Sequence, residues 1–372
     1  KEVGGVFLQK SSESCDKDAC LILKIAKGSV NMPKIEALLK SMDISIQDTY
    51  ASLIKGFVLR VPNAASPPMR LLSSMKDVEL IEDDSRLSVE QWAVERITPK
   101  HRHKSNLAPL NGTDVNVYVV DTGIWTQHGE FDGKAKFAYS VFGNRYGDDS
   151  NGHGTQVASL IGGKTIGLAK GVNLHAVQAM EFDGTGSVSN VLKALEWIAE
   201  NAKLPAVVNM SFNGQKSGVL DSAIDALLEK GIPVVAAAGN EAKNACGMSP
   251  SDDQKAVIVG ASDETDKRAF FSNYGSCVTL FAPGTNVYAA SVPFTPKSMF
   301  GPPVKQSDHY VVTSGTSFAA PFVTASIAML LSSNPSLTPV QLKKIIVDIS
   351  EHGVLKPDSL LNSPNILLQI PL

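Results

Sequence analysis

Five short apolar segments, separated by stretches with helical periodicity, fill much of the chain after residue 114. They are VNVYVV (115–120), LHAVQAM (174–180), AVVNMS (206–211), IPVVAAA (232–238) and AVIVGA (256–261). Between them, apolar residues recur every three or four positions over residues 188–202, and Gly231 ends the helical stretch DSAIDALLEKG. Apolar strands that alternate with helices are typical of a parallel sheet covered on both faces. We therefore predict a doubly wound, mostly parallel α/β fold for this part of the chain.

A different pattern precedes residue 90. Strands are predicted at 19–26, 52–61 and 78–83, and helices at 33–42 and 69–77. We therefore divide the chain into a flexible, patternless N-terminal segment (1–19), a small ferredoxin-like α+β domain (20–90) and a larger domain (91–372). Residues 86–112 show no sustained period, so we expect a linker or a segment that lies along the surface.

Composition excludes several classes of protein. The 372 residues are 43% hydrophobic and 19% charged with a net charge of −3, as in soluble globular proteins. This charge gives no basic surface for nucleic acid, and we find no apolar run near the roughly 18–20 residues of a membrane span. The chain begins at Lys1, without an initiator methionine or a signal-type apolar stretch. We expect processing or a chosen boundary to have removed any targeting segment.

The four cysteines are too few for a disulfide scaffold, and none has zinc-site spacing. They fall into two pairs, Cys15 with Cys20 and Cys246 with Cys277. We interpret Cys246 and Cys277 as a disulfide that closes a loop of about 30 residues and contributes roughly 3–4 kcal/mol. Two buried thiols are the alternative. A disulfide favours an oxidising compartment, whereas the pairing of Cys15 with Cys20 stays open.

Four polar residues follow predicted strands or open predicted helices. Asp121 ends a strand, and parallel sheets build their sites at the carboxyl ends of strands. His153 lies between two glycines in NGHGTQVASL, Ser317 opens a helix in SGTSFAAP, and Asn240 follows the strand VVAAAG. The helix N–H groups beside Ser317 and the Asn240 amide could stabilise one oxyanion. Singly these residues would be a loop cap, a solvated histidine, an N-cap and a turn residue; together, in the chain order Asp, His, Ser, they predict an acyl-transfer site.

The tripeptide at residues 121–123, DTG, is also the signature of aspartic proteases. That class requires a second copy of the signature or a dimer, and the chain contains no other D-[ST]-G sequence. It is also mostly β, whereas this chain alternates strands with helices. We therefore reject the aspartic-protease interpretation.

With its motifs VVDTGI, NGHGTQVA, VVNMSF, VVAAAGN, FSNYGSCVTLFAPG and SGTSFAAP, nearly the whole chain resembles the subtilisin-like serine proteases, and within them the proteinase K-like branch. The resemblance implies that Asp121 orients His153, that His153 is the general base for the nucleophile Ser317, and that Asn240 completes the oxyanion hole. The smaller domain resembles the subtilisin propeptide inhibitor. The resemblance therefore implies a serine endopeptidase that is made as an autoprocessing zymogen. Its substrates would be peptides or proteins, and its own prodomain would be its inhibitor.

The resemblance also implies where substrate binds. An extended peptide would lie between two backbone segments and beside the wall of a specificity pocket: Gly184, Thr185 and Gly186; Ser211, Phe212 and Asn213; Ala238 and Gly239. Ordinary turn chemistry is the alternative for the glycines. Asn213 replaces the family's usual glycine, which would narrow the mouth of the pocket.

No cofactor is implied for catalysis, and we assign no metal ligands. A structural calcium ion is compatible with the family but cannot be assigned: Thr279 stands where the branch often carries an acidic side chain, and Asp252 with Asp253 is more simply a solvated pair. Residues 293–308 form a proline-rich insertion that either contacts substrate or prodomain or is a plain surface loop.

The disulfide and the family place the protein in the secretory pathway or outside the cell. An alternative function is a secreted interaction protein that matures once and keeps its prodomain permanently, with the protease fold as a binding surface. The complete set of Asp121, His153, Asn240 and Ser317 argues against that alternative.

Overall fold

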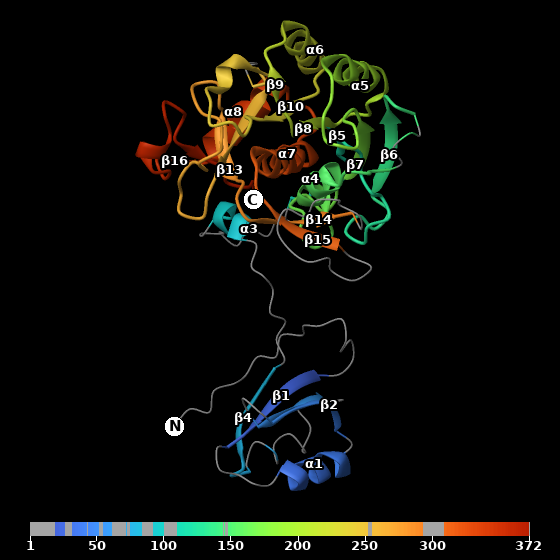
Figure 1. Cartoon of the computed structure of the whole chain (residues 1–372), viewed down its shortest axis with the longest axis vertical. Helices are drawn as coiled ribbons and strands as arrows, with labels where there is room; N and C mark the ends of the chain where they lie inside the picture. The colour runs from blue at the N-terminus through green and yellow to red at the C-terminus, as the bar shows by residue number, and fades with distance from the viewer. Residues whose placement is uncertain are drawn as a thin grey trace. The chain divides into compact units, whose positions relative to one another are not determined.

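The chain divides into two units, Lys1–Val89 and Glu90–Leu372, and each is described by itself. The computed structural model (Figure 1) describes residues 19–26, 32–42, 44–51, 55–61, 72, 75–83, 92–99, 110–143, 145, 148–251, 255–292 and 309–371. Several sequence predictions lie outside the described residues: the segment 1–18 with Cys15, most of the helix at 69–77, the tail 84–90, Asp252 with Asp253, and the insertion 293–308.

The first unit contains a four-stranded antiparallel sheet and a helix. Its elements are β1 (Ala19–Ile25), α1 (Met32–Ser41), β2 (Ser45–Tyr50), β3 (Gly56–Val61) and β4 (Val78–Asp83). The strand order is β2-β3-β1-β4 with every pair antiparallel, as in ferredoxin-like folds. The sequence does not predict β2, because SIQDTY is an exposed edge strand without alternating apolar residues. The core of this unit is formed by Leu23, Ile35, Leu39, Phe57 and Leu59, all nearly inaccessible to solvent.

The second unit is built on a nine-stranded sheet of order β16-β17-β13-β12-β10-β8-β5-β7-β6. Its strands are β5 (Asn116–Asp121), β6 (Ala135–Ser140), β7 (Asn173–Gln178), β8 (Ala206–Met210), β10 (Val234–Ala237), β12 (Val257–Ser262), β13 (Leu280–Pro283), β16 (Glu351–His352) and β17 (Ile366–Leu367). Every pairing is parallel except that of β16 with β17. The predicted mostly parallel sheet is therefore confirmed.

Helices cover both faces of this sheet (Figure 1). They are α3 (Trp92–Ile97), α4 (His153–Gly162), α5 (Val188–Asn201), α6 (Gly218–Glu229), α7 (Thr316–Ser333) and α8 (Pro339–Ile349). Short elements complete the unit: the antiparallel pair β9 (Gly214–Gln215) with β11 (Met248–Ser249), the antiparallel pair β14 (Val287–Ser291) with β15 (His309–Thr313), and the 3₁₀ turns η1 (Ala245–Gly247) and η2 (Pro357–Ser359).

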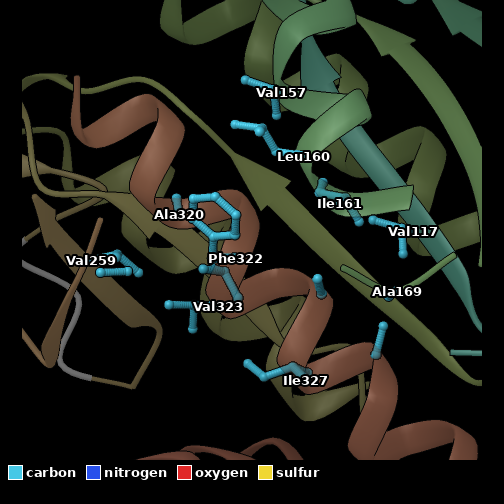
Figure 2. Close-up of a cluster of buried hydrophobic side chains, with 14 of the residues drawn as sticks. Val117, Val157, Leu160, Ile161, Ala169, Val259, Ala320, Phe322, Val323 and Ile327 are labelled. Atoms are coloured by element: carbon cyan, nitrogen blue, oxygen red, sulfur yellow. The ribbon is translucent and has the colours of Figure 1, made fainter. Parts of the chain in front are cut away.

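Alternate residues of each central strand enter two different cores. In β5, Val117 and Val119 pack with α3, α4, α7 and α8, whereas Tyr118 and Val120 pack with α5 and α6. Figure 2 shows side chains of α4 and α7 meeting in the first of these cores, among them Leu160. Because both faces are buried, the strands contain near-continuous apolar residues, which is the feature that the sequence displays.

Helix α7 passes through the centre of the second unit. Among the described helices, α7 alone is long and apolar enough to cross a membrane, with a mean hydropathy of 1.4, but 83% of it is buried inside the protein. The Ser326 hydroxyl donates to the carbonyl oxygen of Phe322 one turn earlier at 2.9 Å, and the Thr324 hydroxyl donates to Oδ1 of the buried Asn209 in β8 at 2.8 Å, so both polar side chains are hydrogen-bonded inside the core. A helix that is apolar all round is typical of a buried core helix.

Part of the expected linker is instead a helix of the second unit. Ala93 and Ile97 of α3 are buried in the core with α7. Arg96 forms ion pairs with Asp266 at 2.7 Å and Glu351 at 2.8 Å. The sequence WAVERI is too short to display a helical period, which is why the sequence analysis does not detect it.

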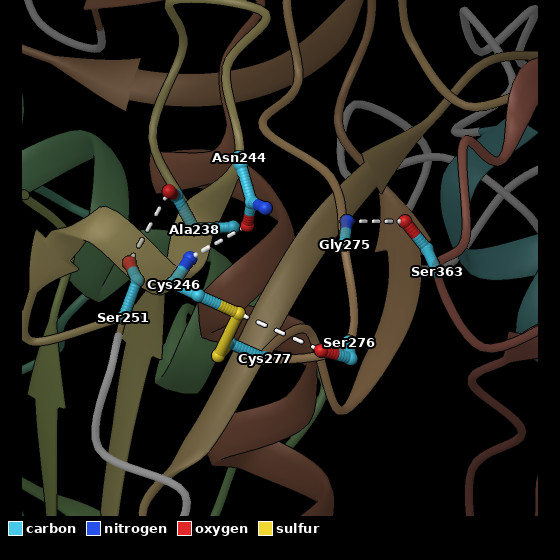
Figure 3. Close-up of a disulfide and its surroundings, with 8 residues drawn as sticks. All are labelled: Ala238, Asn244, Cys246, Ser251, Gly275, Ser276, Cys277 and Ser363. Carbon is cyan, nitrogen blue, oxygen red and sulfur yellow. Dashed lines mark hydrogen bonds between the residues drawn. A yellow bond between two sulfur atoms is a disulfide. The ribbon is translucent and has the colours of Figure 1, made fainter.

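A disulfide joins Cys246 to Cys277, with sulfurs 2.07 Å apart and Cα atoms 5.3 Å apart (Figure 3). The predicted pairing is therefore confirmed. The bond connects η1, just after Asn240 and the end of β10, to the loop that leads into β13. Gly275 in that loop donates to the Ser363 hydroxyl at 2.8 Å, so the covalent link and a hydrogen bond both fix the loop.

Candidate active site

The carboxyl ends of the central strands bring the predicted site residues to one edge of the sheet. β5 ends at Asp121, β8 leads into Ser211, and β10 leads into Ala238 and Asn240. Helix α7 packs against β8 and β10 and carries Ser317 in its first turn.

Asp121 and His153 form a close pair. The Nδ1 atom of His153 lies 2.8 Å from Oδ1 and 3.0 Å from Oδ2 of Asp121. Asp121 is 1% exposed, whereas the His153 side chain is 29% exposed. The carboxylate must accept at this contact, so Nδ1 carries the proton and Nε2 is left as the basic nitrogen. The two residues can therefore act as an orienting acid and a base.

A glycine permits the close approach of α4 to the end of β5. A Cβ atom on Gly154 would lie 2.0 Å from the carbonyl oxygen of Gly123 and 3.1 Å from Cβ of Asp121. No larger residue fits there without moving the backbone. The glycine after His153 in the sequence therefore sets how near the imidazole comes to Asp121.

Two opposing effects act on the pKa of His153. Burial lowers that pKa, whereas the charge of Asp121, its hydrogen bond and the charge of Asp149 raise it, and the net result is a raised pKa. The surroundings therefore favour the protonated imidazole, the form that a general base reaches after it accepts a proton.

Ser317 is the second residue of α7 and is 8% exposed. Its hydroxyl donates to the carbonyl oxygen of Ser211 at 2.8 Å. The expected bond from Ser317 to His153 is therefore not the one formed here, because a hydroxyl has a single proton to donate. The imidazole nevertheless lies beside the first turn of α7, with the rings of His153 and Phe318 5.5 Å apart between centroids.

Asn240 is held by the residue that precedes Ser317. Its Oδ1 accepts from the backbone N–H of Thr316 at 2.8 Å and from the Thr316 hydroxyl at 2.9 Å. These two donors fix the orientation of the amide, and Nδ2 faces Gly315, 3.5 Å from where a Cβ on that glycine would lie. The Nδ2 donor of Asn240 is thus directed to Gly315, two residues before Ser317.

The loop Gly184–Gly186 is exposed beside the segment that carries His153. Asn151, two residues before His153, donates through Nδ2 to the carbonyl oxygen of Phe182 at 2.9 Å. Thr185 closes the loop by bonding Asp183. Gly184, Thr185 and Gly186 are exposed, and the loop is closed by backbone bonds from the Gly184 N–H to Glu181 and from the Glu181 N–H to Thr185.

Around the predicted pocket wall, the structure places Asn213, which the sequence analysis names, together with Asn273 and Glu241, which it does not. A Cβ on Gly239 would lie 2.1 Å from Nδ2 of Asn213 and 2.3 Å from Nδ2 of Asn273. Asn213 donates to Glu241 at 3.2 Å, and Asn273 donates to the carbonyl oxygen of Ala238 at 2.9 Å. The Asn213 amide thus lies directly against Gly239.

The Asp149 carboxylate is a further residue that sequence analysis misses, although it lies four positions before His153 in DDSNGHG. The available signal is an aspartate just ahead of a helix, the ordinary mark of an N-cap.

Among the described residues, no group of three or more His, Cys, Asp or Glu side chains is placed to hold a metal ion. At Thr279, where the proteinase K-like branch often carries an acidic side chain, the hydroxyl instead accepts from the backbone N–H of Ile258 at 3.0 Å.

Comparison with known proteins adds a family to this geometry. A model described as the subtilase family matches residues 112–362. The chain is 35% identical over 338 residues to the extracellular serine proteinase of Thermus sp. (strain Rt41A), covering 88% of this chain and 78% of that protein. It is 35% identical over 325 residues to alkaline serine exoprotease A of Vibrio alginolyticus, covering 83% of this chain and 58% of that protein. It thus spans less than two thirds of the Vibrio protein.

A solved structure also matches. The crystal structure of a cold adapted subtilisin-like serine proteinase aligns with a TM-score of 0.67 and 34% identity, over 76% of this chain and 98% of that one.

Proposed function

Because the chain belongs to the subtilase family of serine peptidases, we propose that it is an endopeptidase that works through Asp121, His153 and Ser317. The observation that carries this proposal is the pair of contacts, 2.8 and 3.0 Å, from His153 Nδ1 to the Asp121 carboxylate. With Nδ1 engaged there, the basic Nε2 is the nitrogen that remains for the nucleophile.

In the proposed reaction the Ser317 hydroxyl leaves the carbonyl oxygen of Ser211 and attacks the peptide carbonyl carbon. Its proton passes to Nε2 of His153, and the Asp121 carboxylate stabilises the imidazolium. His153 then gives the proton to the leaving amine as the C–N bond breaks. Water, activated by the same imidazole, hydrolyses the acyl-enzyme. Subtilases need no cofactor for these steps.

The charge that develops on the carbonyl oxygen needs donors in place beforehand. We assign this role to the backbone N–H of Ser317, at the N-terminus of α7, and to Nδ2 of Asn240. The Thr316 donors that hold Asn240 Oδ1 support the assignment, since they fix the side chain before substrate binds.

Substrate in this proposal extends between the backbones of Gly184–Gly186 and Ser211–Asn213, and its side chain before the scissile bond enters the pocket walled by Ala238 and Gly239. Asn213, which lies against Gly239, narrows the entrance to that pocket.

We also propose that the enzyme is made as a zymogen whose first unit is an inhibitory prodomain, cleaved near the segment EDDSRLSVEQ at residues 82–91. The ferredoxin-like strand order of that unit, folded separately from the second, is in keeping with this role. The Cys246–Cys277 disulfide and the similarity to the extracellular serine proteinase of Thermus sp. support a location outside the cell.

A serine-directed fluorophosphonate probe tests the nucleophile directly. The chain should be labelled at one residue, Ser317, and the Ser317→Ala and His153→Ala variants should not be labelled. The Ser314→Ala variant is the matched control, because Ser314 is exposed and bonds only to the neighbouring loop at Asn286. A chain that is cut once between its units but never labelled would instead be the interaction protein that keeps its prodomain.

A further inference from the structure

Asp149 is a buried carboxylate, 9% exposed, at the N-terminus of α4. Its Oδ1 accepts from the backbone N–H groups of Asn151 at 3.1 Å and Gly152 at 2.8 Å. Its Oδ2 accepts from the backbone N–H of Thr155 at 3.0 Å and from the Thr155 hydroxyl at 2.6 Å. These bonds surround His153, the first residue of the helix, on both sides in sequence.

Asp149 also bonds a different segment of the chain. The Thr122 hydroxyl donates to Asp149 Oδ1 at 3.0 Å and accepts from the backbone N–H of Gly154 at 3.0 Å. Thr122 directly follows Asp121, and its backbone N–H donates to Asp121 Oδ1 at 2.7 Å. One carboxylate and one hydroxyl therefore connect the residue after Asp121 to the residues on either side of His153.

A helix cap by itself does not account for this arrangement. A capping aspartate satisfies N–H groups of its own helix, whereas Asp149 additionally receives a hydroxyl from the end of β5. Burying a carboxylate is unfavourable unless donors surround it, and five donors reach the two oxygens of Asp149. The bond from the Thr122 hydroxyl therefore aligns the end of β5 with the start of α4, in addition to the capping of the helix.

We propose that Asp149 is a positioning residue for the proton transfer, which holds Asp121 and His153 in register and adds a second carboxylate beside the segment that carries His153. The proposal rests on the catalytic roles proposed above for that pair. Asp149 acts through Thr122 and α4 and has no contact with substrate.

The charge of Asp149 acts in the same direction as that of Asp121. The charges of both carboxylates raise the pKa of His153. Asp121 bonds the ring from the end of β5, whereas Asp149 acts from the loop before α4, where burial raises its own pKa although Thr155 and Gly152 donate to it. The next carboxylate along the chain, Asp148, points elsewhere and accepts from the Thr126 hydroxyl at 3.0 Å. Asp148 is therefore a matched control for Asp149.

Three variants test the proposal through steady-state kinetics over a range of pH. In Asp149→Asn, kcat should fall at least about tenfold with KM within about twofold of wild type, and the acid limb of kcat/KM should move to lower pH. In Thr122→Val, which removes the link but keeps the charge, kcat should fall while the acid limb stays in place. In Asp148→Asn, neither quantity should change.

A second measurement does not depend on activity. The titration of the His153 ring, followed by NMR in the Ser317→Ala chain, should show a lower pKa for His153 when Asp149→Asn is added and no change when Asp148→Asn is added. Wild-type kcat together with an unaltered His153 titration in Asp149→Asn would overturn the proposal. Should Asp149→Asn not fold, wild-type kcat in Thr122→Val would overturn it. An inactive wild-type chain would defeat the proposed function, and the NMR titration would still decide the role of Asp149.

Discussion

Ser317 and Ser211 each donate a side-chain hydrogen bond to the backbone carbonyl oxygen of the other, at 2.8 Å in both directions. The exchange fastens the end of β8 to the first turn of α7. It also keeps the Ser317 hydroxyl engaged until substrate and imidazole compete for it. The proposed nucleophile is thus held by a backbone acceptor that no side-chain substitution at residue 211 removes.

Replacing the nucleophile should abolish the chemistry and leave the fold. Ser317→Ala removes the only group proposed to form the acyl-enzyme, so the purified chain should remain full-length by mass spectrometry and inert toward peptides. Thermal unfolding should change little, because one hydrogen bond to the Ser211 carbonyl contributes only about 1 kcal/mol. Cleavage between the two units at the wild-type rate, with contaminating proteases excluded, would contradict the assignment.

Asn240 can be tested by separating its two polar atoms. Asn240→Ala should lower kcat by roughly 10²–10³ with little change in KM, and should also destabilise the fold because Thr316 loses its acceptor. Asn240→Asp keeps that acceptor and removes the donor, so kcat should fall at least as far while the melting temperature stays near wild type. An Asn240→Asp enzyme with normal kcat would show that Nδ2 does not bind the oxyanion.

The sequence predicts five central strands of the nine-stranded sheet, because residues such as Val117 and Val119 in one core and Val120 in the other make a whole strand apolar. It does not predict β2 or α3, because an exposed polar edge strand and a six-residue helix carry little periodic signal. Their conformations depend on tertiary contacts, such as the ion pairs of Arg96 with Asp266 and Glu351.

The site shows the same division. Asp121, His153 and Ser317 can be singled out because each lies in a distinctive local sequence at the end of a strand or the start of a helix. Asp149 cannot, because its role depends on Thr122, 27 residues away in sequence. The orientation of the Ser317 hydroxyl likewise depends on Ser211, 106 residues away. Local patterns thus indicate the chemical groups, whereas long-range hydrogen bonds determine how those groups are held.

The pH dependence of activity should follow His153. Its pKa is raised above the ordinary 6.5, because the Asp121 and Asp149 carboxylates outweigh the effect of burial. Since the base must be neutral, kcat/KM should fall as pH drops through this raised pKa. The folding stability that the raised pKa of His153 contributes has the opposite pH dependence. It is fully present below pH 6.5 and is lost as pH rises through the folded-state pKa.

Asp121→Asn should lower kcat by roughly 10³–10⁴ and move the acid limb of kcat/KM to lower pH. If the acid limb does not move, it reports the titration of another group.

The entrance of the specificity pocket should widen when Asn213 is shortened. The Asn213 amide lies against Gly239 and bonds Glu241 at 3.2 Å, so Asn213→Gly removes a side chain from the proposed pocket wall. The ratio of kcat/KM for a phenylalanine over an alanine before the scissile bond should rise about tenfold. Gln215→Gly, in the exposed strand β9, controls for added backbone flexibility. Equal ratios in the two variants would mean that Asn213 does not limit the pocket.

The tail of the first unit should carry much of its inhibition. β4 is an edge strand that ends at Asp83, and the tail that follows it in sequence, residues 84–90, lies outside the described residues. A tail with a free carboxyl end can bind the cleft as a reaction product does, by pairing with an exposed backbone segment such as Gly184–Gly186. Fragment 1–90 should therefore inhibit the separate second unit at submicromolar concentration, and removal of its last few residues should weaken inhibition at least about tenfold, or roughly 1.4 kcal/mol. Fragment 19–90, shortened at the other end, should inhibit as well as 1–90. If trimming the tail has no more effect than trimming the N-terminus, the inhibitor acts through its folded sheet and helices and not through the cleft.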